Sequence, residues 1–252
     1  METIDDFFIR ENRVEGVISE NDYKQTELVI RSMKAIARMT YKSIYVIDYY
    51  RKNFLYVSDN PIFLCGYSPD EVKDMGYKFY QNQVPPKELS MLLEINKAGF
   101  ELYNATPVEE RMHLFISYDF HIADGGHLKL INHKLTPIVL TDKGNIWLAV
   151  CIVSLSSNKE AGNIEARIDG KPDYWTYSIK DHHWEKRLDV KLNKREKEIL
   201  HLSAQGLSEN AIGAKTNTSL STIKFHKKNL FKKLKIRNIS AAINKASNQK
   251  LI

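Results

Sequence analysis

The sequence predicts an α+β protein, an antiparallel sheet with helices on one face followed by an all-α domain. Two short strand patterns, a helical stretch and three long alternating segments follow one another between residues 42 and 156. Helix start signals and apolar residues at helical spacing then fill residues 192–234. Because strands followed by helices in separate runs are typical of α+β folds or of separate domains, we expect two structural parts.

The composition is that of a globular protein, with 252 residues, 43% of them hydrophobic and 27% charged. The start, METIDDFF, is acidic and has no apolar signal segment, and the longest apolar run, 146–153, is too short to span a bilayer. The two cysteines, Cys65 and Cys151, argue against a disulfide framework. We expect a cytoplasmic protein with no membrane partner.

Residues 1–41 are expected to contain an amphipathic helix, from about 22 to 40. Its apolar stripe consists of Val29, Ile30, Met33, Ile36 and Ala37. The stripe could dock on the chain's own sheet or pair with a second copy, and the few heptads do not decide between the two.

The segment 42–156 is expected to form one domain. We predict strands near 43–48 and 54–58, short helices within 61–80, a longer helix over 87–104, and strands at about 112–123, 128–139 and 146–154. The turns between the last three strands, around Gly125 and Gly144, have hairpin chemistry.

The long strands differ in their patterns. In the first, Met112, Leu114, Ile116, Tyr118, Phe120 and Ile122 alternate with mostly polar residues, which predicts one core face. In the last, both alternating sets are apolar, Ile146, Leu148, Val150 and Ile152 against Trp147, Ala149, Cys151 and Val153. The outer face therefore needs a cover, either the N-terminal helix or another protomer.

This order of elements, with Asn60, the run Cys65-Gly66-Tyr67-Ser68, and Gly144-Asn145 before the last strand, resembles the PAS sensor family. The resemblance implies a sensor domain with a small-molecule or protein partner. The reactive cysteine of flavin-binding members is missing from 76–80, and the histidine of haem-binding members is missing from 87–104. We therefore assign no cofactor, and the cofactor-binding residues stay unknown.

Residues 157–190 form a connector that is predicted to be rich in strands, at 164–168, 174–179 and 183–187. Its aromatic residues, Tyr174, Trp175, Tyr177 and Trp184, supply enough apolar area to dock. We expect a small meander that packs against the sheet domain or against the C-terminal domain.

Residues 191–252 have the start and stop signals of consecutive short helices. Asn193 followed by Glu196 is a capping-box start, and Gly206 ends that helix. Ser208 can cap a second helix, and Ser219 can cap a longer third helix that runs to Leu234. This arrangement is typical of a helix-turn-helix domain.

The third helix has two different faces. At about 100° per residue, Ile223, Leu230 and Leu234 share one face. The opposite face carries Ser221, Phe225, Lys228 and Lys232, with Lys224 beside them. Residues 192–252 contain thirteen Lys and Arg against three acids, a charge of +10 in a chain of net +6. Such a local basic surface is what double-stranded DNA attracts.

The order LNKREKEIL, GLS, TIKFH and KKLKIRN resembles the C-terminal domain of LuxR-type (GerE-like) transcription regulators. The resemblance implies that Lys224, Phe225 and Lys228 face DNA, that Thr222 touches a phosphate, and that His226 is structural. Where the family has Glu-Ile-Ala, this chain has Ala211-Ile212-Gly213. Because glycine is a poor helix former, we expect the second helix to be weakened.

Eight histidines raise the question of a metal site, and His113, His121, His127 and His133 lie near the long strands. None has the spacing of a helical metal pair or a nearby carboxylate cluster, so we predict no metal site. No phosphate loop, nucleophile elbow or carboxylate pair is present, and we predict no enzymatic activity.

The sequence therefore predicts a transcription regulator in which a PAS-like sensor controls a LuxR-type DNA reader. The expected DNA-contacting residues are Ser221, Thr222, Lys224, Phe225, Lys228 and Lys232. Expected partners are double-stranded DNA, a second copy of the chain in a homodimer, RNA polymerase, and a small molecule or protein at the sensor. The alternatives are a sigma-like factor that contacts RNA polymerase and a metal-dependent enzyme in the sheet domain.

Overall fold

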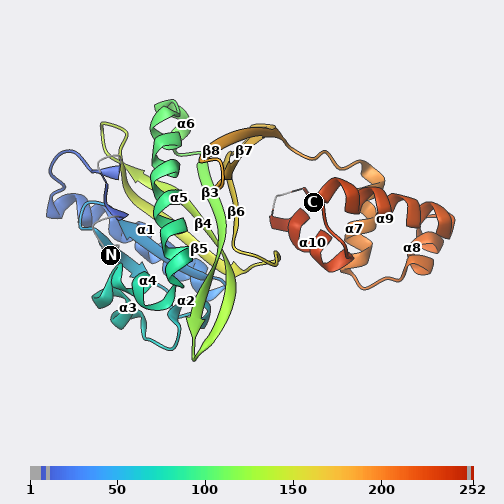
Figure 1. Ribbon diagram of the computed structural model, residues 1–252, viewed down its shortest axis with the longest axis horizontal. Coiled ribbons are helices and arrows are strands. Elements are labelled where there is room, and N and C mark those ends of the chain that lie inside the picture. The colour runs from blue at the N-terminus through green and yellow to red at the C-terminus, as the bar shows by residue number, and fades with distance from the viewer. Residues whose placement is uncertain (1–6, 10–11, 249–250) are drawn as a thin grey trace. The chain divides into compact units, whose positions relative to one another are not determined.

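A computed structural model describes residues 7–9, 12–248 and 251–252 (Figure 1). The strands of these residues form one eight-stranded sheet. The sheet order is β2-β1-β5-β4-β3-β6-β7-β8. The strands are β1 (Ser43–Asp48), β2 (Asn53–Val57), β3 (Leu114–Asp124), β4 (His127–Leu140), β5 (Ile146–Leu155), β6 (Gly162–Ile168), β7 (Asp173–Ser178) and β8 (His183–Leu188). The chain divides into two compact units, residues 1–187 and 188–252.

The helices of unit 1 are α1 (Glu20–Arg38), α2 (Pro61–Leu64), α3 (Pro69–Met75), α4 (Lys78–Gln83), α5 (Pro86–Ala105) and α6 (Val108–Arg111). The buried side chains of α2 to α5 share one core with the inward residues of the sheet. Unit 2 contains only helices among its described residues. The predicted class, an antiparallel sheet with helices followed by an all-α domain, is confirmed.

Helix α1 covers the opposite face of the sheet from α2 to α5. Ser19 and Asp22 form a capping box at its start. The Tyr23 hydroxyl donates to the Asp48 carboxylate over 2.6 Å, and its ring meets that of Trp147 edge-on at 5.2 Å between centroids. The N-terminal helix thus docks on its own sheet, the first of the two possibilities that the sequence left open.

Strand β5 is buried on both faces, as its pattern requires. Ala149, Cys151 and Val153 point into the main core, whereas Leu148 lies with Trp147 in the smaller cluster under α1. The pairing of β4 with β5 is irregular at this end, which allows two consecutive residues to face α1. The cover that the sequence demanded is therefore supplied within the chain.

The first long strand starts later than the sequence predicts. Met112 caps the end of α6 with a side chain that is 42% exposed, and β3 begins at Leu114. Arg111 explains the difference, because its guanidinium donates to the carbonyls of Thr106 and Gly144 and holds this segment in a turn.

The connector strands extend the main sheet. Strand β6 pairs antiparallel with β3, from Leu114 opposite Ile168 onward. The loop between β5 and β6 is held by Asp119, a buried carboxylate that accepts hydrogen bonds from the side-chain amides of Asn132, Asn158 and Asn163. Burying this charge is tolerable because three donors replace water.

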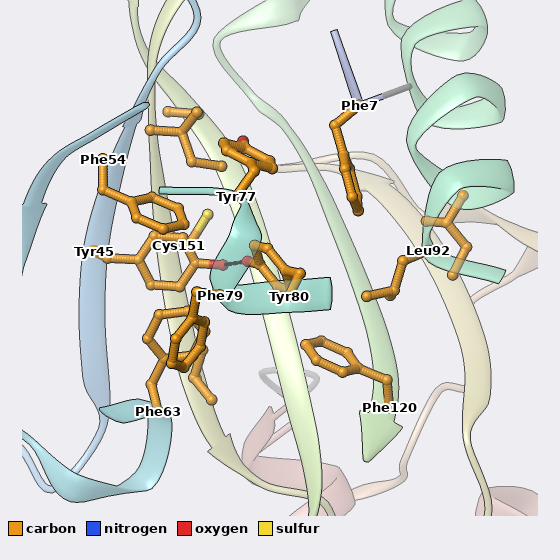
Figure 2. Close-up of a cluster of buried hydrophobic side chains, with 14 of the residues drawn as sticks. Phe7, Tyr45, Phe54, Phe63, Tyr77, Phe79, Tyr80, Leu92, Phe120 and Cys151 are labelled. Carbon is orange, nitrogen blue, oxygen red and sulfur yellow. Dashed lines mark hydrogen bonds between the residues drawn. The ribbon is translucent and has the colours of Figure 1, made fainter. Parts of the chain in front are cut away.

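The core between the sheet and its helices is rich in aromatic residues and encloses a small polar network (Figure 2). The hydroxyls of Tyr45 and Tyr80 are hydrogen-bonded to each other, and the Tyr45 hydroxyl lies 2.5 Å from Nε2 of His133. The Tyr118 ring packs on the His133 ring at 4.7 Å. The second ring nitrogen of His133 has no partner among the described residues.

Helix α5 is fastened to the sheet at both ends. Near its start, Glu88 accepts from the backbone N–H of His121 over 2.6 Å and contacts the ring of the same histidine at 2.7 Å. Near its end, the Tyr103 hydroxyl donates to the carbonyl of Gly144 over 2.9 Å. In the middle of α5, the Asn96 amide donates to the Phe7 carbonyl over 3.0 Å, and the other contacts on the sheet side are packing contacts.

Unit 2 consists of α7 (Lys194–Ala204), α8 (Glu209–Lys215), α9 (Leu220–Leu234) and α10 (Ile239–Asn248). Two small cores hold it together. Ile199, Leu202, Ile212 and Ile223 form one, and Leu200, Leu230, Leu234, Ala242 and Ala246 form the other. Helix α10 was absent from the sequence prediction, although its buried alanines complete the second core.

The buried His133 should make unit 1 sensitive to acid. Burial lowers the pKa of His133 to about 3 from an ordinary value of 6.5. Below pH 6.5 the unfolded chain therefore binds a proton that the folded chain does not. The free energy of unfolding should fall by up to about 1.4 kcal/mol per pH unit as the pH drops towards 3.

His133→Gln removes this titration and keeps a group that can bond to Tyr45. Urea unfolding at pH 7, 6 and 5 should show a steeper loss of stability for the wild type than for the variant. Equal slopes in the two proteins would mean that His133 takes up its proton in the folded state.

Candidate nucleic-acid interface

The start of α9 is set by hydroxyl side chains. Ser219 precedes the helix in an extended conformation, and its Oγ accepts from the backbone N–H of Thr222 over 3.2 Å. The same oxygen lies 2.9 Å from Oγ of Ser221 and 2.8 Å from Oγ1 of Thr222. This cap fixes where the first helical turn begins, and with it the direction of every side chain on α9.

The six residues predicted to contact DNA all lie on exposed positions of α9. They are Ser221, Thr222, Lys224, Phe225, Lys228 and Lys232. The face opposite to them is fully packed, because Ile223, Leu230 and Leu234 are at most 1% exposed. The helix therefore presents a polar and basic surface that contains one aromatic ring.

That ring belongs to Phe225, which is 59% exposed. It meets the ring of His226 edge-on, with centroids 5.7 Å apart. His226 is half-buried and stands between the packed and exposed faces. The phenyl group is thus steadied on one side by its neighbour while most of its surface stays open to an incoming partner.

The five lysines of α9 divide into two groups. Lys227 and Lys233 are tied to other helices of unit 2. Lys227 Nζ lies 2.7 Å from Glu209 of α8, and Lys233 Nζ lies 2.8 Å from Glu196 of α7. Among the described residues, Lys224, Lys228 and Lys232 make no hydrogen bond or ion pair. These three ammonium groups are available to phosphates.

Ala211 leaves α8 without the acid of a capping box. Glu209, in the first turn of α8, instead pairs with Lys227 of α9 at 2.7 Å. The hydrogen bond from Lys227 is the main cause that lowers the pKa of Glu209. Ser208 still caps α8 by accepting from the N–H of Ala211 over 3.3 Å.

Glu196 anchors α7 to α9. Its carboxylate is almost completely buried, accepts from the backbone N–H of Asn193 over 2.8 Å, and pairs with Lys233. A buried carboxylate that lost either partner would be costly, so this contact fixes α9 relative to the rest of the unit.

Gly213 permits a close turn between α8 and α9. A Cβ at this position would lie 2.7 Å from the carbonyl oxygen of Thr218, and the Thr218 N–H donates to the Gly213 carbonyl over 2.9 Å. The glycine that helix propensity marks as a weakness is therefore the residue that lets the turn approach α8 this closely.

The comparisons with known proteins bear on unit 2 first. Residues 190–246 match the model of a family described as bacterial regulatory proteins, luxR family. This segment is a LuxR-type helix-turn-helix domain. A sequence comparison with curated proteins gave no significant match.

Among solved structures, the response regulator ChrA of a haem-sensing two-component system is 38% identical over 27% of this chain, with a TM-score of 0.24. This chain covers 33% of ChrA, so it spans about a third of that protein. The phage VqmA–DPO complex is 14% identical over 93% of this chain and 92% of VqmA, with a TM-score of 0.32.

A Vibrio cholerae VqmA–ligand–DNA complex is 14% identical over 88% of both chains, with a TM-score of 0.34. These TM-scores are too low for a likeness over the whole chain to bear on function.

Unit 1 contains a second candidate site, a cavity of about 50 Å³ between α5 and the sheet. Its walls include Ile95, Asn96, Gly99, Phe100 and Tyr103 of α5, and Ile116, Tyr118 and Leu135 of the sheet. Burial raises the pKa of the Tyr118 hydroxyl, and it raises that of Tyr103 to about 12. Both phenols therefore stay protonated in this largely apolar space.

The described residues contain no cluster of three or more His, Cys, Asp and Glu side chains suited to a metal ion. In the same part of the chain, no helix has the length and apolar character that crossing a membrane requires.

Proposed function

We propose that this protein is a transcription regulator that binds specific sites on double-stranded DNA through the exposed face of α9. The observation that carries the proposal is the division of the α9 lysines. Two of the five hold the domain together, and the other three share an open face with Phe225. A helix that enters the major groove needs such a face, with cations for phosphates and side chains that reach base edges. This role places the protein in the cytoplasm, with the chromosome.

The proposal is tested by selecting bound duplexes from a random DNA library with the intact protein and no RNA polymerase. Enrichment of a defined sequence supports a regulator that reads DNA by itself, with RNA polymerase as a later partner at the promoter. Enrichment that requires polymerase would favour the sigma-like alternative instead.

The three open lysines should each contribute to affinity for the selected site. We expect Lys224→Ala, Lys228→Ala and Lys232→Ala to weaken binding, because each removes a cation from the face that meets the DNA. A lysine that neutralises a phosphate should also reduce the slope of log affinity against log salt by about 0.9. Fluorescence anisotropy over a range of salt concentrations measures both effects.

Lys34→Ala is the matched control, since it removes the same charge from an exposed position on α1. It should leave the salt slope unchanged. If all four variants had the slope of the wild type, the exposed face of α9 would not be the surface that contacts phosphates.

Phe225 is proposed to read a base. A phenyl ring cannot form paired hydrogen bonds with a purine edge, but it can pack on the methyl group of thymine in the major groove. Phe225→Ala should lose discrimination at one base pair, worth about 1 to 3 kcal/mol, and keep its affinity for nonspecific DNA. If the ring only packs against its own helix, both affinities and the thermal stability should fall together.

The decisive comparison uses a preferred site with thymine and the same site with uracil. The wild type should bind the uracil site more weakly, whereas Phe225→Ala should bind both equally. Equal sensitivity of the two proteins to the missing methyl group would refute a role for Phe225 in reading it.

Unit 1 is proposed to be a PAS-like sensor whose ligand occupies the cavity beside α5. Three tyrosines and Asn96 place a few polar groups in an apolar space, the usual character of a small-molecule site. As it stands, the cavity is about a third of the roughly 150 Å³ that admits benzene in an engineered protein. A ligand of that size must therefore move α5 or the side chains around it.

The protein is proposed to act as a homodimer. Leu28 and Met39 are 67% and 80% exposed on the outer side of α1, and helix-turn-helix regulators commonly bind two half-sites related by a two-fold axis. Sedimentation of the full chain at roughly tens of micromolar should give a dimer. Leu28→Glu with Met39→Glu should shift it to monomer, and a wild type that already sediments as a monomer would contradict the proposal.

A further inference from the structure

The β7–β8 hairpin has a weak backbone connection to the rest of unit 1. Strand β7 is paired with β6 at three positions, from Arg167 opposite Tyr174 to Glu165 opposite Thr176. Strand β8 lies at the edge of the sheet, next to β7, and its side chains are mostly exposed. The position of the hairpin therefore depends on the contacts that its side chains make.

Side chains of the hairpin contact α5, one from β8, one from β7 and one from the turn between them. The Trp184 indole N–H donates to the Ala98 carbonyl over 3.1 Å, and the Tyr177 hydroxyl donates to Glu94 over 3.0 Å. The His182 ring lies 2.7 Å from the same Glu94 oxygen. Burial and the bond to Glu94 raise the pKa of Tyr177 to about 12, so it remains a donor. Glu94 and Ala98 are one helical turn apart.

The same stretch of α5 lines the cavity with its other surface. Ile95, Asn96 and Gly99 line the cavity. Glu94 and Ala98, on the neighbouring surface of the helix, accept the hydrogen bonds from the hairpin. A Cβ on Gly99 would lie 2.8 Å from Cδ1 of Ile116, so helix and sheet already touch at this point. With both ends of α5 fastened, a ligand larger than the cavity displaces the middle of the helix.

The chain beyond the hairpin enters unit 2 almost at once. Trp184 packs with the core of unit 1, whereas Val190 and Leu192 pack with the second core of unit 2. Five residues, 185–189, lie between these anchors, and five residues span at most about 18 Å when extended. The hairpin and α7 are therefore joined by a short stretch of chain.

We propose that the β7–β8 hairpin is a relay that follows the middle of α5 and sets the freedom of the DNA-binding unit. The contacts of Trp184, Tyr177 and His182 make the hairpin move with α5, and the short connection carries that movement to α7. This inference rests on the proposed function, in which unit 1 senses a ligand and unit 2 binds DNA. It assigns the connector the role of the coupling element.

The first test is a double-mutant cycle on the full chain. Gly99→Leu replaces a ligand by filling the cavity and pushing on Ile116, with Gly99→Ala as the milder variant if the larger one does not fold. Tyr177→Phe, His182→Asn and Trp184→Phe together remove the three contacts but leave two of the rings. Gly99→Leu should change the affinity for a selected duplex by about fivefold or more. In the background of the triple variant that ratio should fall to about one.

His183→Asn is the control for the hairpin, since its ring contacts the Asp181 carbonyl and Glu185 rather than α5. It should leave the effect of Gly99→Leu intact. Effects of Gly99→Leu that are equal with and without the three contacts would overturn the relay.

The second test needs neither DNA nor a ligand, so it separates the relay from the proposed function. Amide hydrogen exchange of the full chain should become faster in residues 173–193 when Gly99→Leu or Gly99→Ala is introduced, by about tenfold. The triple variant should show fast exchange there with or without the substitution at 99. Unchanged exchange in the hairpin of the Gly99 variants would refute the relay even if DNA binding is confirmed.

Discussion

Strand β5 is apolar on both faces, and the architecture of unit 1 follows from the need to cover it. On one side, Ala149 and Cys151 lie in the aromatic core under α5; on the other, Leu148 lies under α1. Helix α1 covers the outer face over β1, β2, β5 and the end of β4, whereas α2 to α5 cover the inner face. The β7–β8 hairpin continues the same sheet beyond β6 and contacts the flank of α5.

Buried polar groups give each unit its specific geometry. In unit 1, Asp119 holds the loop that leads to β6, and His133 is held neutral in contact with Tyr45. In unit 2, Glu196 and Glu209 each bind a lysine of α9 and so fix that helix against α7 and α8. An unpaired charge at Glu196, which is almost completely buried, would cost several kcal/mol, whereas Glu209 keeps a third of its side chain exposed and its pair with Lys227 contributes about 1 kcal/mol or less. The pairs Glu196–Lys233 and Glu209–Lys227 thus help to fix the direction in which the open face of α9 points.

In the proposed relay, the candidate ligand cavity and the β7–β8 hairpin contact neighbouring surfaces of one helix. Helix α5 is anchored at Glu88 and Tyr103, with a cavity on one side of its middle and aromatic hydrogen-bond donors on the other. A displacement of the helix is resisted on the cavity side by packing and by the hydrogen bond from Asn96 to Phe7, and on the hairpin side by three polar contacts. In the proposed relay, coupling between the two units needs no rearrangement of the sheet itself.

The sequence by itself determined the order and type of nearly all elements, because periodicity, caps at Asn193, Ser208 and Ser219, and glycine turns act over a few residues. It also determined which side of α9 is open, since 100° per residue separates Ile223 from Lys228 without reference to any other helix. Only the tertiary structure decided that α1 covers its own sheet, that β6 pairs with β3, and that α10 closes the second core of unit 2. The tertiary structure also decided which lysines of α9 are paired. Nothing in the sequence distinguishes Lys227 and Lys233 from the other three, but these two bind carboxylates on other helices. These outcomes depend on contacts between residues far apart in the chain, and local patterns carry no information about which distant partner a side chain meets.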